Sequence, residues 1–436
     1  MSVYSLTSFL SRWRWVSICF AALCIITPGC PAQAQDGVRT LDAFLQLARQ
    51  NSPLLLDNAG QVAQVRLDSL RRRALQRPQV TGNAAAVAAP IIRRNTTTGD
   101  GGLGYDEAVS NGGNYTAYVG ATQPLFNAPT LRNDYQVLAN QGVALRNTGR
   151  LAALDLRRSI TDQFLTAFAA QQQWSYSQSL LRQLRQQDEL LRRLVNGGVY
   201  KQTQYLTYYA SVRNQEVTVL QNELSYRREL GTLRYLSGVI DTTLLLVERP
   251  APPTHRQLAG LGSITQQQYV LDSLRIGLAR RAIDLTYRPQ VSWVADIGLQ
   301  SSTLQRFGNH AGFSGGLVLS VPIFDGHQRQ IAYSRLAVDD RIRQGYRTFL
   351  TRQRRQQYDQ LSGLARASDR LLATIRQQIS IANTLIEAGR SQLAAGDISI
   401  LDYLLLITSY RDLQFSLAQA ETERLRNLYA LDYLAE

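Results

Sequence analysis

The chain has 436 residues and a formal net charge of +14, with 47 lysines and arginines against 33 acids. Lys201 is its single lysine. A basic balance of this size is compatible with binding to nucleic acid or a membrane surface. However, no nucleic-acid module accompanies it, and the arginines are scattered among glutamines along helical stretches. We therefore interpret them as solvated helix faces and expect no nucleic-acid partner.

Residues 1–34 have the features of a secretory signal peptide. Arg12 and Arg14 form a positive flank, residues 15–26 form an apolar core, and Ala32-Gln33-Ala34 supplies the small residues of a cleavage site. The apolar run is too short to predict a membrane-spanning helix.

All three cysteines, Cys19, Cys24 and Cys30, lie in this leader. The mature chain would then carry no disulfide, no thiolate metal site and no catalytic cysteine. An alternative is lipidation, because residues 27–30 read Thr-Pro-Gly-Cys and loosely resemble a lipoprotein signal with Cys30 acylated. The threonine and the proline argue against this alternative.

Two helices are predicted before the first strand. Thr40 is placed to cap a helix whose apolar residues recur at helical spacing. Pro53 predicts a break near Asn51–Ser52, because proline fits badly inside a helix. The second helix is expected to continue to Gln76 and to end before Pro78.

Strand-like alternation appears in two β-hairpins, over residues 79–123 and 290–322. The second shows it more clearly, with Trp293, Ile297 and Leu317 among the apolar residues of one face. About ten residues per strand suits either a half-buried soluble sheet or a tilted strand across a bilayer. In the first hairpin, residues 93–113 are rich in Gly, Asn and Thr and are predicted to form a solvent-facing loop.

Very long helical stretches follow the hairpins, over residues 128–238 and 326–436. Each is interrupted by glycine, at Gly197-Gly198 and at Gly396, so each is predicted to fold back on itself. In the second stretch, apolar and small residues alternate at intervals of three and four, which is typical of a coiled-coil seam. They are Leu372, Ile375, Ile379, Ala382, Ile386, Gly389 and Leu393.

The two halves of the chain form an internal repeat. Pro124 and Pro322 lie 198 residues apart, and Gly198 and Gly396 keep the same spacing. An unchanged offset over more than a hundred residues indicates that helix geometry is held constant between the halves.

This offset defines a first repeat over residues 35–238 and a second over residues 263–436. The linker between them, residues 239–262, contains three prolines. Upstream of the strands, Pro78 and Pro289 lie 211 residues apart, so the first hairpin is 13 residues longer than the second.

Four strands per chain cannot close a membrane barrel, and open sheet edges are not tolerated in lipid. If the hairpins lie in a membrane, several copies must pool their strands, and three copies would supply twelve. The leader, the cysteine-free mature chain and the absence of an apolar helical span agree with the outer membrane of a Gram-negative bacterium.

Residues 40–434 resemble the TolC-type outer-membrane efflux proteins. The resemblance rests on the order, spacing and duplication of four short motifs: Thr40-Leu41-Asp42-Ala43-Phe44, Gln123-Pro124-Leu125-Phe126, Val321-Pro322-Ile323-Phe324-Asp325-Gly326, and Ala395 to Leu404. It implies a mainly α fold with a small β part. Three copies would form a 12-stranded outer-membrane β-barrel, continued by a periplasmic α-helical barrel. The implied partners are outer-membrane lipid, a periplasmic adaptor and an inner-membrane pump or ABC exporter.

The resemblance gives the helix breaks a role at the far tips of the molecule. Gly197, Gly198, Gly396 and Asp397 would form the periplasmic mouth and contact the adaptor. The alternative is that these glycines are only helix turns.

Asp402 matches a position at which members of this family carry an acid that lines the constricted entrance. Three copies would form a ring of carboxylates that attracts cations. Gln204 holds the equivalent position of the first repeat, and Leu405 stands where some relatives have a second acid. The alternative is an ordinary helix N-terminal acid favoured by the helix dipole.

The two Pro-aromatic elements are interpreted as corners between a strand and a long helix: Pro124, Phe126, Pro322 and Phe324. Proline ends a strand without needing a ladder donor, and the aromatic side chain would anchor near the membrane face. Asn127 and Asp325 then lie where a helix cap belongs.

No catalytic, cofactor or metal site is predicted. His255, His310 and His327 are not paired at ligand spacing, and no nucleophile–base constellation or phosphate loop is present. The sequence predicts the passive exit duct of a tripartite efflux or type I secretion system, opened at its periplasmic tip by its partners. Drugs, metal ions and secreted proteins all remain candidate substrates. The alternative is a soluble periplasmic coiled-coil scaffold without channel activity.

Overall fold

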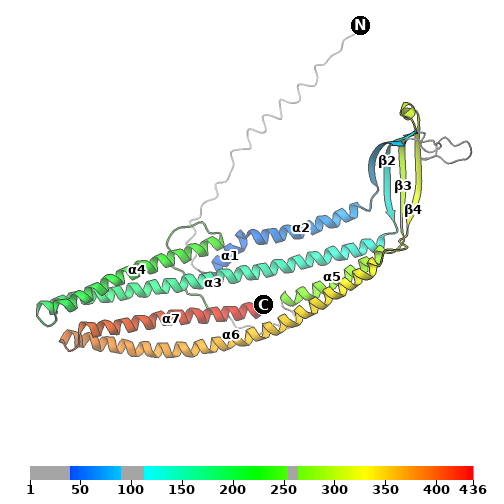
Figure 1. Ribbon diagram of the computed structural model, residues 1–436. Coiled ribbons are helices and arrows are strands. Elements are labelled where there is room, and N and C mark those ends of the chain that lie inside the picture. The colour runs from blue at the N-terminus through cyan, green and yellow to red at the C-terminus, as the bar shows by residue number, and fades with distance from the viewer. Residues whose placement is uncertain (1–39, 90–111, 254–263, 436) are drawn as a thin grey trace, which may run out of the picture.

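The computed structural model describes residues 40–89, 112–253 and 264–435. The predicted signal peptide with Cys30, most of the predicted loop of the first hairpin, and part of the linker lie outside these residues. Figure 1 shows an elongated molecule with a small sheet at one end and long helices running away from it. The prediction of a mainly α fold with a small β part is confirmed.

The first repeat opens with two helices that precede the sheet. The Oγ1 of Thr40 accepts a hydrogen bond from the backbone N–H of Ala43 at 3.3 Å, so Thr40 caps the first helix as predicted. Pro53 begins the second helix, where the N–H that it lacks would have had no partner. The helices of this repeat are α1 (Leu41–Asn51), α2 (Pro53–Ala74), α3 (Ala128–Asn196) and α4 (Gln202–Ser237).

The second repeat contains counterparts of the last three of these helices. They are α5 (Ile264–Thr286), α6 (Gln328–Ala395) and α7 (Ile400–Ala435), with a short 3₁₀ helix at Leu304–Asn309. The long helices α3 and α6 have 69 and 68 residues, and α4 and α7 have 36 each.

The sheet joins the two repeats through antiparallel pairing in the order β1-β2-β3-β4. Its strands are β1 (Gln79–Ala89), β2 (Gly112–Leu125), β3 (Gln290–Ser301) and β4 (Ala311–Ser320). Val119 lies opposite Ile297, which lies opposite Phe313. This register places the alternating apolar residues of neighbouring strands on one common face.

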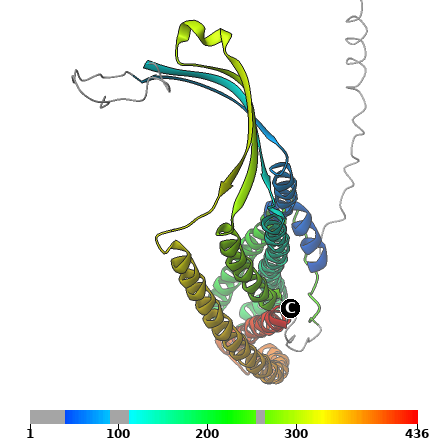
Figure 2. The same ribbon diagram turned by 90° about the vertical axis from the view of Figure 1, so that its right-hand side faces the viewer.

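Below the sheet, four helices stand side by side in the order α2-α3-α5-α6. Figure 2, which looks from the sheet end, shows α2 and α6 at the two sides of this row. The order of the helices repeats the order of the strands, because α2 leads into β1 and α6 follows β4. The molecule therefore has two open sides, each made of an edge strand and a helix.

Farther from the sheet, α3 pairs with α4 and α6 pairs with α7 as two helical hairpins (Figure 1). In α6 the predicted seam is confirmed, since Leu372, Ile375, Gly389 and Leu393 are buried while most neighbouring positions are exposed. At Gly389 a Cβ atom would lie only 2.8 Å from Leu406 Cδ1, so glycine allows close contact with α7.

The described part of the linker, residues 239–253, has no regular structure and lies against the helical hairpins. The backbone N–H of Val247 donates to Gln171 Oε1 at 2.7 Å, and Gln171 Nε2 donates to the carbonyl of Val247 at 3.0 Å. The hydroxyl of Tyr429 donates to the carbonyl of Ala251 at 2.8 Å. These bonds satisfy backbone groups that a helix or strand would otherwise satisfy.

The core is divided between two levels along the helices. One cluster joins α1, α3, α4, α7 and the linker and includes Phe44, Phe164, Tyr226, Val247 and Tyr429. A second cluster fills the far ends of the two hairpins. Full burial of such side chains contributes about 1.5–3 kcal/mol each. Within the described ranges, no helix is both long enough and apolar enough to span a membrane.

Candidate functional site

The sheet presents one apolar face that no described residue covers. Phe313 and Leu317 of β4 are 88% and 73% exposed, and Ile297 of β3 is exposed beside Phe313. The opposite face carries mainly small and polar residues, together with Val294 and Val318, and on it the hydroxyl of Ser314 donates to Asp296 Oδ2 at 2.6 Å. A sheet with an exposed apolar face and a polar face fits an apolar surrounding on one side only.

The aromatic residues of β2 and β3 are divided between the two faces of the sheet. Trp293 and Tyr115 lie on the apolar face, and Trp293 Nε1 donates to Gln123 Oε1 on the neighbouring strand at 3.0 Å. Tyr118 lies on the polar face. A Cβ at Gly298, which lies opposite Tyr118, would come within 2.4 Å of the Tyr118 Cα, so only glycine fits there.

The two predicted corners differ from each other. Strand β2 does not end before Pro124 but continues to Leu125, with Pro124 opposite Ser292. Residues beyond Thr122 have no partner on β1, so the missing N–H is tolerated at this position. Strand β4 ends earlier, at Ser320, and Pro322 lies outside it. The hairpins were predicted to end at residues 123 and 322, whereas their last strands end at Leu125 and Ser320.

Both corner aromatics, Phe126 and Phe324, are exposed. Phe126 has a φ of 53°, a left-handed conformation that is rare for an aromatic residue. At the second corner the left-handed residues are Gly326 and His327. The chain therefore turns from strand to helix by different backbone routes in the two repeats.

Of the two predicted helix caps at these corners, Asp325 and Asn127, only Asp325 accepts hydrogen bonds from the start of its helix. Asp325 accepts hydrogen bonds from the backbone N–H of Arg329 at 2.8 Å and of His327 at 3.0 Å. A hydrogen bond from the Tyr287 side chain, followed by these backbone bonds, holds the pKa of Asp325 below its usual range. Asn127 makes no cap with its side chain, which instead donates to Gln76 Oε1.

The glycines at the far tips act as the helix ends that the sequence predicts. Gly198 and Gly396 have φ values of 80° and 84°, whereas Gly197 is right-handed with a φ of −76°. After α6, the backbone N–H of Asp397 donates to the carbonyl of Gln392 at 2.9 Å. This bond satisfies a carbonyl that the helix end leaves free.

The two tips contact each other. The hydroxyl of Tyr200 lies 2.8 Å from the carbonyl oxygens of both Leu393 and Ile398, on the other hairpin. Burial raises the pKa of this hydroxyl, and the nearby carboxylate of Asp397 adds to the shift. A Cβ at Gly396 would lie 2.9 Å from Val199 Cγ1. Sequence periodicity gave no signal for Tyr200, because it lies between two helices.

Asp402 and Gln204 lie near the tips, in the first turns of α7 and α4. Asp402 Oδ2 accepts from the hydroxyl of Ser399 at 2.7 Å, and the Ser399 Oγ accepts from the N–H of Asp402 at 3.1 Å. Gln204 Oε1 accepts from the backbone N–H of Lys201 at 3.4 Å. Both residues therefore reach back to the helix start, as in a capping box.

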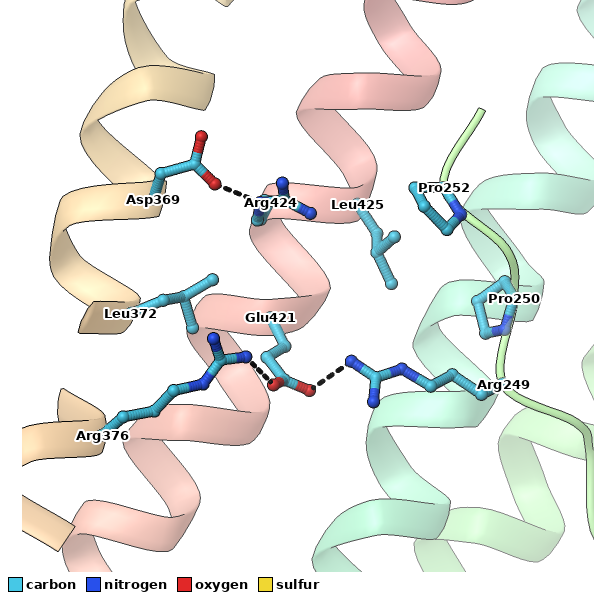
Figure 3. Close-up of a pocket in the computed structure, with 9 residues that line it drawn as sticks. All are labelled: Arg249, Pro250, Pro252, Asp369, Leu372, Arg376, Glu421, Arg424 and Leu425. Atoms are coloured by element: carbon cyan, nitrogen blue, oxygen red, sulfur yellow. Dashed lines mark hydrogen bonds and ion pairs between the residues drawn. The ribbon is translucent and has the colours of Figure 1, made fainter. Parts of the chain in front are cut away.

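A group of ion pairs fastens the linker to the second hairpin halfway along the helices. Figure 3 shows Glu421 of α7 between Arg249 of the linker and Arg376 of α6, at 3.2 and 2.8 Å. Arg424 pairs with Asp369 beside them. They line a cavity of about 330 Å³. Both acids are already paired with arginines. We therefore interpret these ion pairs as contacts that hold the linker, α6 and α7 together, and not as a binding site for a charged ligand.

Among the residues that the structure describes, no group of three or more His, Cys, Asp or Glu side chains is placed to hold a metal ion. The Nδ1 of His310 lies 2.9 Å from the carbonyl oxygen of Arg306. His327 is the left-handed N-cap residue of α6, and His255 lies outside the described residues.

Solved structures of outer-membrane proteins have the same fold. The open-state MtrE outer membrane channel of Neisseria gonorrhoeae matches with a TM-score of 0.70 and 14% identity, covering 91% of this chain and 88% of that chain. The outer membrane protein VceC of Vibrio cholerae gives 0.68 and 14%, covering 91% and 94%. CusC, described as forming a transmembrane channel, gives 0.69 and 12%, covering 91% and 92%. No protein-family model and no curated protein matches the sequence.

The chain therefore has the fold of these membrane proteins, which is the fold that its resemblance to the TolC-type proteins implies. The likeness extends over the sheet and the helices together, since about nine-tenths of each chain is covered.

Proposed function

We propose that this protein is the outer-membrane exit duct of a tripartite efflux or type I secretion system. Three copies pool their strands into a twelve-stranded barrel in the outer membrane of a Gram-negative bacterium. The helices continue the pore into the periplasm. The observation that carries this proposal is the uncovered apolar face of the sheet, on which Phe313 and Leu317 are exposed.

Two physical arguments support the pooling of strands. A contiguous apolar face in water is unfavourable, at about 25 cal/mol per Å² of apolar surface, and lipid removes that cost. In lipid, however, the unpaired backbone groups at the edges of β1 and β4 need partners. Pairing of β4 in one copy with β1 in the next satisfies both edges at once. The solved structures of MtrE, named as an outer membrane channel, and of CusC, described as forming a transmembrane channel, support the same interpretation.

The far tips are the proposed meeting place with a periplasmic adaptor, and through it with an inner-membrane pump or ABC exporter. Gly197, Gly198, Gly396 and Asp397 lie at the helix turns farthest from the sheet, where a partner reaches them first (Figure 1). The duct itself is passive and takes its energy from the pump. Docking opens the mouth by separating the two hairpins at the tip.

The proposed aperture contains one Asp402 from each copy. Three carboxylates around one axis attract cations into the mouth. Asp402→Asn is expected to reduce cation preference, measured as a shift of reversal potential under a salt gradient in a planar bilayer. Ser399→Ala is the matched control, because it removes the capping partner and keeps the charge. Unchanged selectivity in Asp402→Asn would exclude the ring.

The main test uses two neighbouring residues on opposite faces of β4. Leu317→Arg places a charge on the proposed lipid face, at a cost of about 2–4 kcal/mol per chain near the bilayer centre. Val318→Arg places the same charge on the polar face. We expect wild type and Val318→Arg to form conducting channels in planar bilayers, and Leu317→Arg to lose insertion. A soluble scaffold instead predicts extraction without detergent, no conductance and equal behaviour of the two variants.

A further inference from the structure

The four described strands contain a single charged side chain, Asp296 of β3. It lies midway along its strand, on the face that carries mainly small and polar residues. Its Oδ2 accepts a hydrogen bond from the hydroxyl of Ser314 on β4 at 2.6 Å. No cation in the described part of the chain forms an ion pair with it. The sheet of this basic protein therefore carries one negative charge per chain.

Four glycines surround Asp296 on this face of the sheet. They are Gly120 of β2, Gly298 of β3, and Gly312 and Gly316 of β4. The larger neighbours on the same face are Val294 and Tyr118. Because glycine has no side chain, these four positions do not cover the carboxylate. Asp296 accordingly stays partly exposed at the centre of the sheet.

The first hairpin has the same pair of positions without the acid. The offset of 211 residues maps Asp296 onto Ala85 of β1, and the offset of 198 residues maps Ser314 onto Thr116 of β2. Ala85 lies opposite Thr116 in the sheet, as Asp296 lies opposite Ser314. Both hairpins therefore carry the hydroxyl side chain, whereas only the second carries the carboxylate.

We propose that Asp296 lines the interior of the β-barrel and makes the exit end of the duct selective against anions. This inference rests on the proposed function, because it needs three copies that close one barrel. The polar face of the sheet then lines the pore, and the barrel carries a ring of three carboxylates halfway along its strands. The ring is separate from the aperture proposed at Asp402, because the sheet and the helix tips lie at opposite ends of the molecule (Figure 1). Cations and neutral molecules are the class of substrate that it favours.

The hydrogen bond to Ser314 does not by itself explain the acid. Strands β3 and β4 are already joined by backbone pairing from Gln290 to Leu299. The first hairpin pairs in the same way with alanine at the equivalent position, so the pairing does not need a carboxylate. A charge halfway across a membrane is also costly unless it faces water. A water-filled pore satisfies that condition.

The width of the barrel determines how far the charge of the ring acts. Twelve strands that are about 4.8 Å apart and tilted by about 40° give a backbone radius of about 12 Å. The Debye length is about 10 Å at 0.1 M ionic strength, about 30 Å at 0.01 M and about 3 Å at 1 M. The potential of the ring therefore reaches the pore axis in dilute salt and is screened in concentrated salt. This salt dependence distinguishes an effect of charge from a change in pore width.

Removal of the charge tests the proposal in planar bilayers under a salt gradient. Asp296→Asn keeps the shape of the side chain and an acceptor for Ser314, but it removes the charge. In dilute salt we expect the cation-to-anion permeability ratio, obtained from the reversal potential, to fall by about twofold or more. In 1 M salt the difference from wild type should disappear. Ser314→Ala is the matched control, because it removes the hydrogen bond, keeps the charge and should leave the ratio unchanged.

Relocation of the charge separates electrostatics from local structure. Ala85→Asp places a carboxylate on the same face of the sheet, in the first hairpin. Added to Asp296→Asn, it is expected to restore the cation preference, which a role limited to the bond with Ser314 cannot explain. Ala85→Asp alone should raise the preference above that of wild type, and it tests the same inference if Asp296→Asn does not assemble.

The conductance of the wild type separates the possible failures. If the wild type conducts and neither Asp296→Asn nor Ala85→Asp changes the permeability ratio in dilute salt, the inferred ring is wrong and the proposed duct stands. The ring is also wrong if Ser314→Ala lowers the ratio as much as Asp296→Asn does. If the wild type forms no channel, the proposed function is contradicted and the ring falls with it.

Discussion

The helices α3 and α6 hold the same place in the two repeats and have 69 and 68 residues, yet their surroundings differ. Near the sheet, α3 lies between α2 and α5, whereas α6 has α5 on one side and no described helix on the other. The buried side of α3 carries asparagine, and the uncovered side of α6 carries Ile331 and Val338. At these equivalent positions the usual distribution is reversed, because the buried residues of α3 are polar and the exposed residues of α6 are apolar.

We infer from this reversal that residues exposed in the single chain are covered in an assembly. An exposed apolar helix side is unusual for an isolated soluble protein and indicates a contact with another surface. The side-chain Nδ2 atoms of Asn133, Asn140 and Asn147 on α3 donate to carbonyl oxygens of α5, whereas their Oδ1 atoms are buried without a hydrogen-bond partner among the described residues. The second repeat thus keeps the helix geometry of the first, and we propose that its outer side contacts another copy.

The largest effect is expected for Asn133→Asp on the covered side of α3. The carboxylate would be buried and would face the carbonyl oxygen of Leu278, which now accepts from Asn133 Nδ2. A buried charge without a donor costs about 3 kcal/mol or more. We expect a marked fall in the denaturation midpoint, followed by the helical circular dichroism signal in detergent.

Ile331→Asp is the matched change on the uncovered side of α6. It places the same charge in solvent within one chain, so helical content should be unchanged, while the fraction of trimer should fall. If Ile331→Asp unfolds the chain as Asn133→Asp does, or leaves assembly untouched, the contrast between the two helices is wrong.

A smaller effect is expected at the tips, where the two repeats also differ. Gly396→Ala forces a left-handed conformation on alanine, at a cost of about 1–2 kcal/mol, and its Cβ meets Val199. Gly197→Ala lies in a right-handed turn and should be nearly neutral. Proteolysis at the tips would measure the difference. Equal protection of both variants would argue against a role for left-handed geometry in holding the tips together.

The smallest effect concerns pH. Burial raises the pKa of Tyr429 to about 12, whereas an unfolded tyrosine titrates near 10. The stability contributed by this neutral hydroxyl is complete below pH of about 10 and is lost as the pH rises toward 12. Tyr429→Phe should therefore make the fall of the melting temperature over that interval shallower. Tyr235→Phe, at an exposed position, should leave it unchanged. A slope that does not respond to Tyr429→Phe would show that another group controls alkaline unfolding.

Much of the fold could be predicted because the repeat and the periodicities report directly on geometry. Gly198 and Gly396 mark helix ends through their left-handed backbone, and the seam from Leu372 to Leu393 marks a helix side by spacing alone. The ends of the strands were less predictable. Pro124 remains inside β2. The pairing of β1 with β2 reaches only Thr122, so the missing N–H of Pro124 breaks no hydrogen bond to β1.

Side-chain partners across distant elements could not be predicted from one sequence. Asn127 lies at a cap position but donates to Gln76, since the turn brings α2 close to it. Asn133, Asn140 and Asn147 of α3 did have a signal in their seven-residue spacing, but their acceptors on α5 were not predictable from it. Tyr200 had none, because its two acceptors lie on the other hairpin.

We propose that several copies assemble side by side, with the sheet and the helices of one copy continued by those of the next. Native mass spectrometry of the full-length protein, expressed in a Gram-negative host and released from detergent micelles, tests it most directly. We expect one dominant species with the mass of three mature chains. A dominant species with the mass of one chain, under conditions in which the helical circular dichroism signal is retained, would contradict it.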